Sequence, residues 1–211
     1  MEADALLLYC VPPMIPIRDV IPSRTTPGIT LLLIGLNLLV FGVMVVTEGS
    51  LPDHSVPWLR EALSLFRHGS LVHLASNLAA LWLFGENVED RFGHLRFLMG
   101  YLGLGYAAAL ADLWLTPSPT SLFTGAAGAV AGIVAAYLVM FPRSRFLAIV
   151  PTGVPPNLME LPASAVAAAW FLLQVARGTG PLTLFVGAAA GVVAAWLLRR
   201  PERQRVDWWA E

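Results

Sequence analysis

Apolar residues gather into six long stretches along the chain, separated by shorter polar or proline-containing segments. The hydrocarbon core of a bilayer is about 30 Å thick, so a helix that crosses it needs roughly 20 apolar residues. Backbone groups in lipid must satisfy one another, which makes a helix the expected structure of each stretch. The pattern therefore predicts an all-α membrane protein, a bundle of six transmembrane helices. The approximate bounds are 29–47, 70–88, 95–115, 123–141, 161–176 and 182–198.

Composition agrees with a membrane protein and excludes other classes. Of the 211 residues, 57% are hydrophobic and 13% are charged, whereas a soluble domain is about 45–50% apolar and about 25% charged. A disordered chain would be polar and charge-rich. The single cysteine, Cys10, permits neither an intramolecular disulfide nor a cysteine-based metal site. His68 and His73 are five residues apart, an awkward spacing for two ligands on one helix, so we expect no metal and no cofactor.

The basic residues predict how the chain is oriented. All 13 are arginines, and ten of them fall before the first stretch, in the second and fourth connections, at Arg96 beside the second connection, or after the sixth stretch. Cytoplasmic loops carry an excess of positive charge, which places both termini in the cytoplasm, in a membrane such as the bacterial inner membrane. The chain then divides into a cytoplasmic tail at 1–28, a six-span domain at 29–198 and an Arg-rich tail at 199–211. We expect a re-entrant or interfacial helix at 48–69 and a structured loop at 142–160.

Polar side chains interrupt the second stretch. Inside a membrane they are costly, and by default they indicate a functional site. His73 and Asn77 are four residues apart, so they share one face of a helix, and His68 lies about one turn earlier. The simpler interpretation is that these side chains hydrogen-bond neighbouring helices and hold the bundle together. On the residues alone, both interpretations stay open.

Small residues recur at a spacing of four in the fourth and sixth stretches. Gly128 and Gly132 form one such pair, and Gly187 and Gly191 form the other. Pairs of this kind let two helix backbones approach closely in a membrane. We therefore expect the fourth and sixth stretches to pack against each other.

Taken together, these motifs resemble the rhomboid intramembrane serine proteases, from about residue 14 to residue 198. The likeness rests on the polar positions of the second stretch and on a run of matching positions between Phe84 and Tyr101. It also rests on Gly125-Ala126-Ala127-Gly128, which stands where the family has Gly-x-Ser-Gly. In that family a serine on the fourth span attacks the peptide bond and a histidine on the sixth span is the base. A histidine and an asparagine on the second span help to hold the oxyanion, and the resemblance assigns these positions to His73 and Asn77.

Both members of the family's catalytic dyad are replaced by apolar residues in this sequence. The nucleophile position is Ala127, and the base position is Leu184, which lies three residues before Gly187 and seven before Gly191. All four histidines precede residue 95, so no shift of register supplies a base to the sixth span. A hydroxyl is a poor nucleophile until a base removes its proton. The resemblance and this departure from it together predict a catalytically inactive member, a pseudoprotease.

The resemblance implies a pocket beside the missing dyad and a role in binding. We expect His68, Thr124, Gly125 and Gly128 to line this pocket. The expected partners are membrane lipid and transmembrane segments of other membrane proteins, with no nucleic acid. One alternative is an active intramembrane endopeptidase with a non-standard site, such as Thr124 paired with His73. The other is a structural membrane bundle that binds no client.

Overall fold

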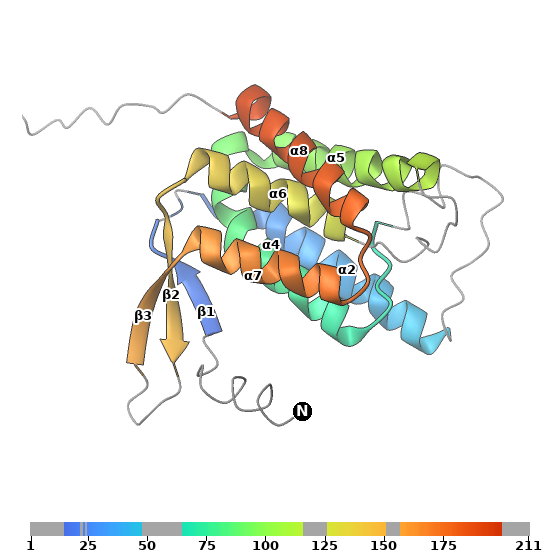
Figure 1. Ribbon diagram of the computed structural model, residues 1–211, viewed down its shortest axis with the longest axis horizontal. Coiled ribbons are helices and arrows are strands. Elements are labelled where there is room, and N and C mark those ends of the chain that lie inside the picture. Colours follow the sequence, from blue (N-terminus) through green and yellow to red (C-terminus); the bar gives the residue numbers. More distant parts are fainter. Residues whose placement is uncertain are drawn as a thin grey trace, which may run out of the picture.

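Six helices and a small sheet make up the part of the chain described by the computed structural model, which covers residues 15–21, 23, 25–47, 65–115, 126–150 and 157–199 (Figure 1). Each of these helices coincides with one of the apolar stretches, with ends that differ by no more than four residues. The mostly helical fold that the apolar pattern predicts is therefore observed. The helices are α2 (Gly28–Val46), α4 (Leu71–Phe92), α5 (His94–Leu115), α6 (Ala127–Met140), α7 (Ala163–Ala176) and α8 (Pro181–Leu198).

The described helices differ in how well they fit a membrane. By length and composition alone, α2 and α8 can cross a bilayer. α6 and α7 are apolar but have only 14 residues each. α4 and α5 have 22 residues each, with charged residues on both sides of the turn at Gly93 that joins them. The φ angle of Gly93 is 83°, a region open to glycine. The full count of six spans stays a prediction.

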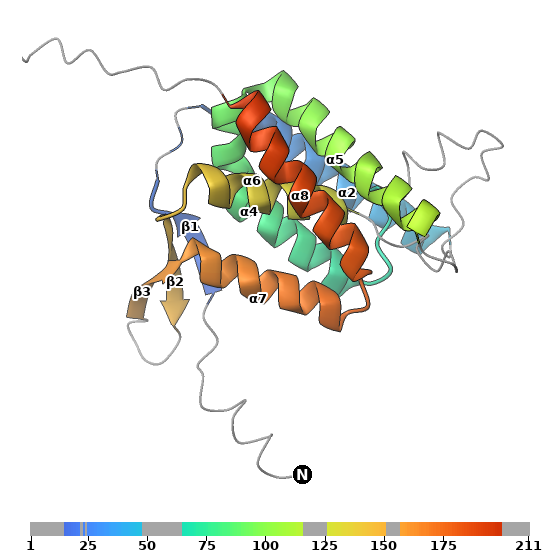
Figure 2. The same ribbon diagram turned by 45° about the horizontal axis from the view of Figure 1, so that its top comes forward.

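α6 lies at the centre of the bundle. It is buried from Ala127 to Val134 and again at Ala136 and Tyr137, and it packs against α4, α5, α7 and α8. Two views of the ribbon show α8 and α5 crossing beside α6, with α7 at the edge of the bundle (Figures 1 and 2). Large apolar side chains are exposed along α2 and α8, as expected of surfaces that face lipid.

A three-stranded antiparallel sheet closes one end of the bundle, and it corrects the purely helical expectation. Its strands, in the order β1-β2-β3, are β1 (Ile15–Asp19), β2 (Arg145–Val150) and β3 (Asn157–Pro162). β1 lies within the predicted tail and β2 within the predicted loop, whereas β3 begins in that loop and runs two residues into the predicted fifth span. Proline cannot donate to a central ladder. Pro16 and Pro162 both occupy edge strands, where a missing N–H donor is tolerated.

Asp19 joins the sheet to the helices. Its carboxylate accepts hydrogen bonds from Asn87 Nδ2 at 2.7 Å, from Ile21 N at 3.0 Å and from the hydroxyl of Tyr137. Burial raises the pKa of Asp19 because desolvation disfavours the charged carboxylate. Strand β1, α4 and α6 therefore meet at one half-buried acid.

Glu89 joins three helices at the same end. Its fully buried carboxylate accepts hydrogen bonds from Ile29 N at 2.9 Å, Thr30 N at 2.8 Å and Thr30 Oγ1 at 2.7 Å. The first N–H groups of a helix lack partners within it, and the helix dipole favours a negative charge there. His94 Nδ1 lies 2.5 Å from Glu89 Oε1. An acid of α4 thus caps α2 and contacts the first residue of α5.

Candidate functional site

The three polar residues singled out on the second stretch come together in the structure. His73 and Asn77 lie one turn apart on α4, and His68 lies three residues before that helix begins; all three are buried. Ser70 is the N-cap, and its hydroxyl accepts a hydrogen bond from His73 N at 3.2 Å, which fixes where α4 begins. The imidazole rings of His68 and His73 meet edge to face, with centroids 5.2 Å apart.

Several polar atoms around this site are buried and lack a hydrogen-bonding partner within the described part of the chain. They include Nε2 of His68, Nε2 of His73 and Nδ2 of Asn77, and on α8 Oγ1 of Thr183. A buried polar group left without a partner costs about 1–3 kcal/mol. Three of these atoms belong to His68, His73 and Asn77, at and just before the start of α4.

Residues of α7 and the turn after it fix the amide of Asn77. The hydroxyl of Thr179 donates to Gln174 Oε1 at 3.2 Å, and Gln174 Nε2 donates to Asn77 Oδ1 at 2.5 Å. This chain of donors occupies the carbonyl oxygen of Asn77 and leaves its NH₂ group free to donate. Trp170 Nε1 also donates to the backbone oxygen of Ser76 at 3.1 Å. We call the contacts of Trp170 and Gln174 with Ser76 and Asn77 the α4–α7 latch.

The sequence analysis missed the latch. Trp170 and Gln174 are four residues apart, and they are the two polar-tipped side chains on the buried face of α7. That spacing was a usable signal, since side chains at i and i+4 share a helix face. The spacing does not show which helix these two side chains contact, because any of several apolar spans could pack against this face of α7.

Gln174→Leu is expected to destabilise the protein by about 1–2 kcal/mol, because it leaves a buried amide oxygen of Asn77 unpaired. The test is a double-mutant cycle that combines Gln174→Leu with Asn77→Leu. The free energy of unfolding of each variant is measured by reversible unfolding in mixed micelles. Interhelical hydrogen bonds in membranes couple by about 0.6 kcal/mol on average, up to about 1.7 kcal/mol. The buried, short contact should lie in the upper half of that range. Strictly additive effects of the two substitutions would contradict the latch.

The two positions that the resemblance assigns to the catalytic dyad are both buried in the apolar core. Ala127 opens α6 and Leu184 lies in the first turns of α8; neither has exposed surface, and both belong to one hydrophobic cluster. Next to Leu184 stands the hydroxyl of Thr183. Within the residues that the structure describes, that hydroxyl is not paired with an imidazole, since Nε2 of His68 and of His73 also lack partners. Thr124 and Gly125 lie outside the described residues.

The small residues of α6 and α8 bring these positions close. A β-carbon added to Gly187 would lie 2.1 Å from the carbonyl oxygen of Gly128, and one added to Gly191 would lie 2.0 Å from that of Gly132. Real β-carbons do not approach an oxygen so closely, so the two backbones are in direct contact. The methyl group of Thr183 also lies against Gly128, and this contact brings the start of α8 against the start of α6.

A helix bundle with large apolar side chains exposed along its outer helices has the character of an integral membrane protein. The rhomboid domain family matches residues 55–201, and the chain belongs to the rhomboid family. It is 30% identical over 144 residues to the rhomboid protease GluP of Bacillus subtilis, which covers 61% of this chain and 28% of GluP. It is 30% identical over 116 residues to the rhomboid protease AarA of Providencia stuartii, which covers 49% of this chain and 40% of AarA.

A plant relative extends the same likeness. Rhomboid-like protein 11, chloroplastic, of Arabidopsis thaliana is 29% identical over 158 residues, covering 70% of this chain and 55% of the relative. The chain thus spans from about a quarter to just over half the length of these relatives. The family that the motifs suggest is confirmed, and the activity of this chain has to be argued from its own site.

Proposed function

We propose that this chain is a six-span rhomboid-fold protein that binds transmembrane segments of other proteins without cleaving them, with both termini in the cytoplasm. One observation carries the proposal. His73 and Asn77, whose side chains can bind a carbonyl, are buried with unpaired nitrogen atoms, while the positions that the resemblance assigns to the nucleophile and the base are Ala127 and Leu184. Two of the relatives are named proteases, and the family's serine and histidine are replaced by Ala127 and Leu184 at the positions that the resemblance assigns.

The chemistry of the site favours holding over hydrolysis. Ala127 has no oxygen to attack a peptide bond, and Leu184 has no atom that accepts a proton. The NH₂ group of Asn77, freed by the bond from Gln174, is the type of donor that stabilises a carbonyl or an oxyanion. A backbone carbonyl of a bound segment would receive this hydrogen bond, and no covalent step would follow.

The placement of α7 supports access from the side. Only Ala163, Ala167, Trp170 and Gln174 of this helix are buried, so most of its surface faces away from the bundle (Figure 2). The latch is its polar attachment to α4. Breaking it would part the two helices and release the carbonyl oxygen of Asn77, whose NH₂ group is already free, to an arriving segment.

Photocrosslinking tests the proposal. A diazirine side chain placed at position 184 is expected, in native membranes, to form adducts that mass spectrometry maps to membrane-spanning segments of other proteins. The matched control is position 185, because Phe185 is 63% exposed on the same helix whereas Leu184 is fully buried. Adducts at 184 with lipid alone, or no adduct, would favour the structural bundle without a client.

A fluorophosphonate probe separates binding from the enzymatic alternative. The purified chain is expected to remain unlabelled and to leave a transmembrane substrate intact. Labelling that disappears in Thr183→Val would establish a non-standard enzyme, because Thr183 carries the described hydroxyl beside the base position. Labelling that survives this change would direct attention to Thr124, the hydroxyl residue considered from the sequence.

A further inference from the structure

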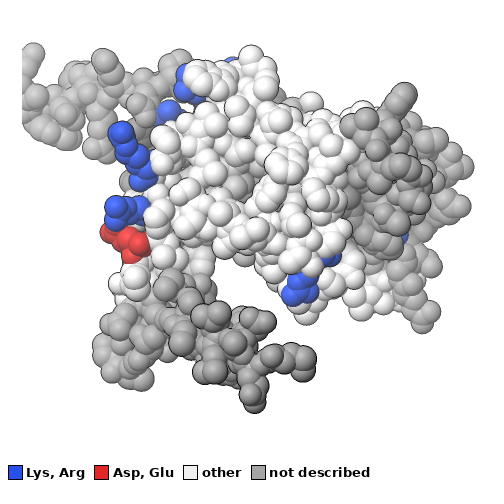
Figure 3. All heavy atoms as spheres, in the orientation of Figure 1, with Lys and Arg blue, Asp and Glu red and all other residues white. Residues whose placement is uncertain are grey.

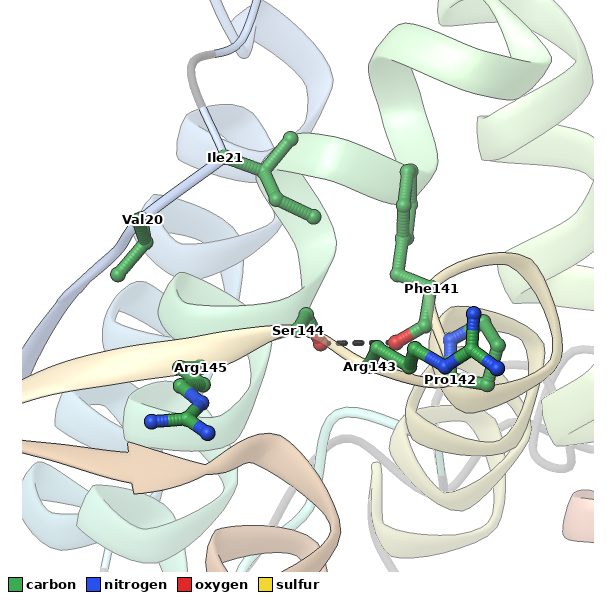
Figure 4. A pocket seen from close by; sticks show the side chains of 7 residues that line it. All are labelled: Val20, Ile21, Phe141, Pro142, Arg143, Ser144 and Arg145. Atoms are coloured by element: carbon green, nitrogen blue, oxygen red, sulfur yellow. Dashed lines mark hydrogen bonds between the residues drawn. The ribbon is translucent and has the colours of Figure 1, made fainter.

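A second site lies at the sheet end of the bundle, far along the helices from the polar site on α4. A pocket of about 460 Å³ opens there between the end of β1 and the turn that leads from α6 to β2. Figure 4 shows Val20 and Ile21 on one side and the turn on the other. Its lining residues are Val20, Ile21, Phe141, Pro142, Arg143, Ser144 and Arg145.

The walls of this pocket are apolar, and its charged groups are all basic. Val20, Ile21, Phe141 and Pro142 supply the apolar surface, and Arg143 and Arg145 supply two guanidinium groups. The hydroxyl of Ser144 is already used, since it donates to the backbone oxygen of Phe141 at 2.8 Å and so holds the turn (Figure 4). The pocket thus offers positive charge next to hydrocarbon-like surface.

More arginines surround the pocket. The guanidinium carbon of Arg91 lies 5.7 Å from the centre of the Phe141 ring, which places a third cation against the aromatic wall. The space-filling view shows basic side chains gathered at the end of the molecule where the sheet lies (Figure 3). An acidic neighbour, Glu160, meets Arg145 at 3.4 Å, and both side chains are exposed. Such an exposed pair is weak, so a stronger anion could displace Glu160.

The position of the pocket along the bundle indicates which kind of anion it would bind. Phe141 is the C-cap of α6, the central helix, so the pocket begins where the apolar bundle ends. In the proposed six-span arrangement, on which this step rests, a phospholipid headgroup would occupy this level, with its phosphate outermost and its glycerol and acyl chains toward the bundle. Guanidinium groups match phosphate oxygens geometrically, and basic pockets at the ends of membrane helices bind anionic headgroups.

We propose that this pocket binds the phosphate headgroup of an anionic phospholipid, with Arg143 and Arg145 contacting the phosphate and the apolar wall contacting the glycerol and first acyl carbons. The site is separate from the one on α4 and does not depend on whether the chain binds clients. It holds lipid at the turn that links the central helix to the sheet.

Native mass spectrometry of the full chain in mixed micelles tests the site. The probes are phosphatidylglycerol and phosphatidylcholine, which share a phosphate but differ in net charge. The chain is expected to retain phosphatidylglycerol in preference, and Arg143→Gln with Arg145→Gln should lower that retention by about fivefold for each arginine removed. Glu160→Gln should raise retention, because it frees Arg145 from its carboxylate.

Arg96→Gln is the matched control. Arg96 is exposed at the start of α5, at the same end of the bundle, and it does not line the pocket. Its loss should leave phosphatidylglycerol retention within twofold of the natural chain. Each variant must keep the natural unfolding temperature for its result to count for the pocket rather than for folding.

Three outcomes would overturn the site. If Arg96→Gln lost as much phosphatidylglycerol as the Arg143→Gln and Arg145→Gln double variant, the lipid would be held by diffuse attraction to surface charge rather than by the pocket. Unchanged retention in the folded double variant would show that the two arginines do not hold the headgroup. Displacement of phosphatidylglycerol by millimolar inorganic phosphate would show a site for the free anion rather than for lipid.

Discussion

A chain that carries both Ala127→Ser and Leu184→His is expected to react with a fluorophosphonate probe, whereas the natural chain is not. The two substitutions put a hydroxyl at the start of α6 and an imidazole in the first turns of α8. The contacts of Gly187 with Gly128 and of Gly191 with Gly132 already hold those helices at backbone distance. His73 and Asn77 would supply the oxyanion donors, so the variant lacks no member of the family's site.

Each single variant is the control. Members of a serine protease dyad act as a unit, and loss of the nucleophile or the base alone costs on the order of 10⁶ in turnover. Ala127→Ser without a base and Leu184→His without a nucleophile should therefore both stay at background. Adding Asn77→Ala to the double variant should lower its labelling rate by about 10²–10³, the effect typical of losing one oxyanion donor.

The same experiment bears on the proposed function. Labelling of the double variant would show that the natural chain keeps the geometry of a protease and lacks only its reactive groups. A substrate cleaved by that variant would then identify a segment that the natural chain binds. A folded double variant that stays unlabelled would mean that α6 and α8 hold positions 127 and 184 in another geometry, and the argument from retained oxyanion donors would lose its basis.

The helices were predictable from the sequence because length and apolarity alone determine them. The stretch at 29–47 became α2 (Gly28–Val46), and the stretch at 182–198 became α8 (Pro181–Leu198). The close approach of α6 and α8 was also foreseeable, since the spacing of Gly187 and Gly191 repeats that of Gly128 and Gly132. In both cases the signal is a pattern within each segment, either its length and apolarity or its spacing of small residues.

The rest depends on pairing between distant segments, which a single sequence does not display. β1 forms only because Ile15–Asp19 finds the free edge of β2, about 130 residues later. Glu89 looked like part of an acidic helix end, yet it is buried because the N-terminus of α2 needs an acceptor. The bond from Gln174 to Asn77 likewise joins two helices that are 97 residues apart. In all three cases the residue type was visible and the partner was not.

Gly191→Ala is expected to cost at least about 3 kcal/mol of stability, at or beyond the upper end of the usual effect of overpacking. The added carbon would lie 2.0 Å from the carbonyl oxygen of Gly132 and 2.6 Å from its α-carbon. Both contacts are with backbone, so no side chain can rotate away, and α8 would have to move off α6. Thermal unfolding in detergent should show most of the variant unfolded at temperatures where the natural chain is intact.

Alanine substitutions at two other glycines, Gly132 and Gly42, serve as comparisons for Gly191→Ala. Gly132→Ala meets the end of Leu104 at 2.7 Å and the backbone of Gly187 at 2.9 Å, so a smaller loss is expected. Gly42→Ala on α2 meets nothing within 4 Å and should be neutral or stabilising by up to about 1 kcal/mol, because alanine favours the helix. The expected order of stability is Gly42→Ala, then Gly132→Ala, then Gly191→Ala. Equal effects at all three positions would mean that the α6–α8 contact is not the tight junction of the bundle, and that position 184 is not held against the start of α6 by it.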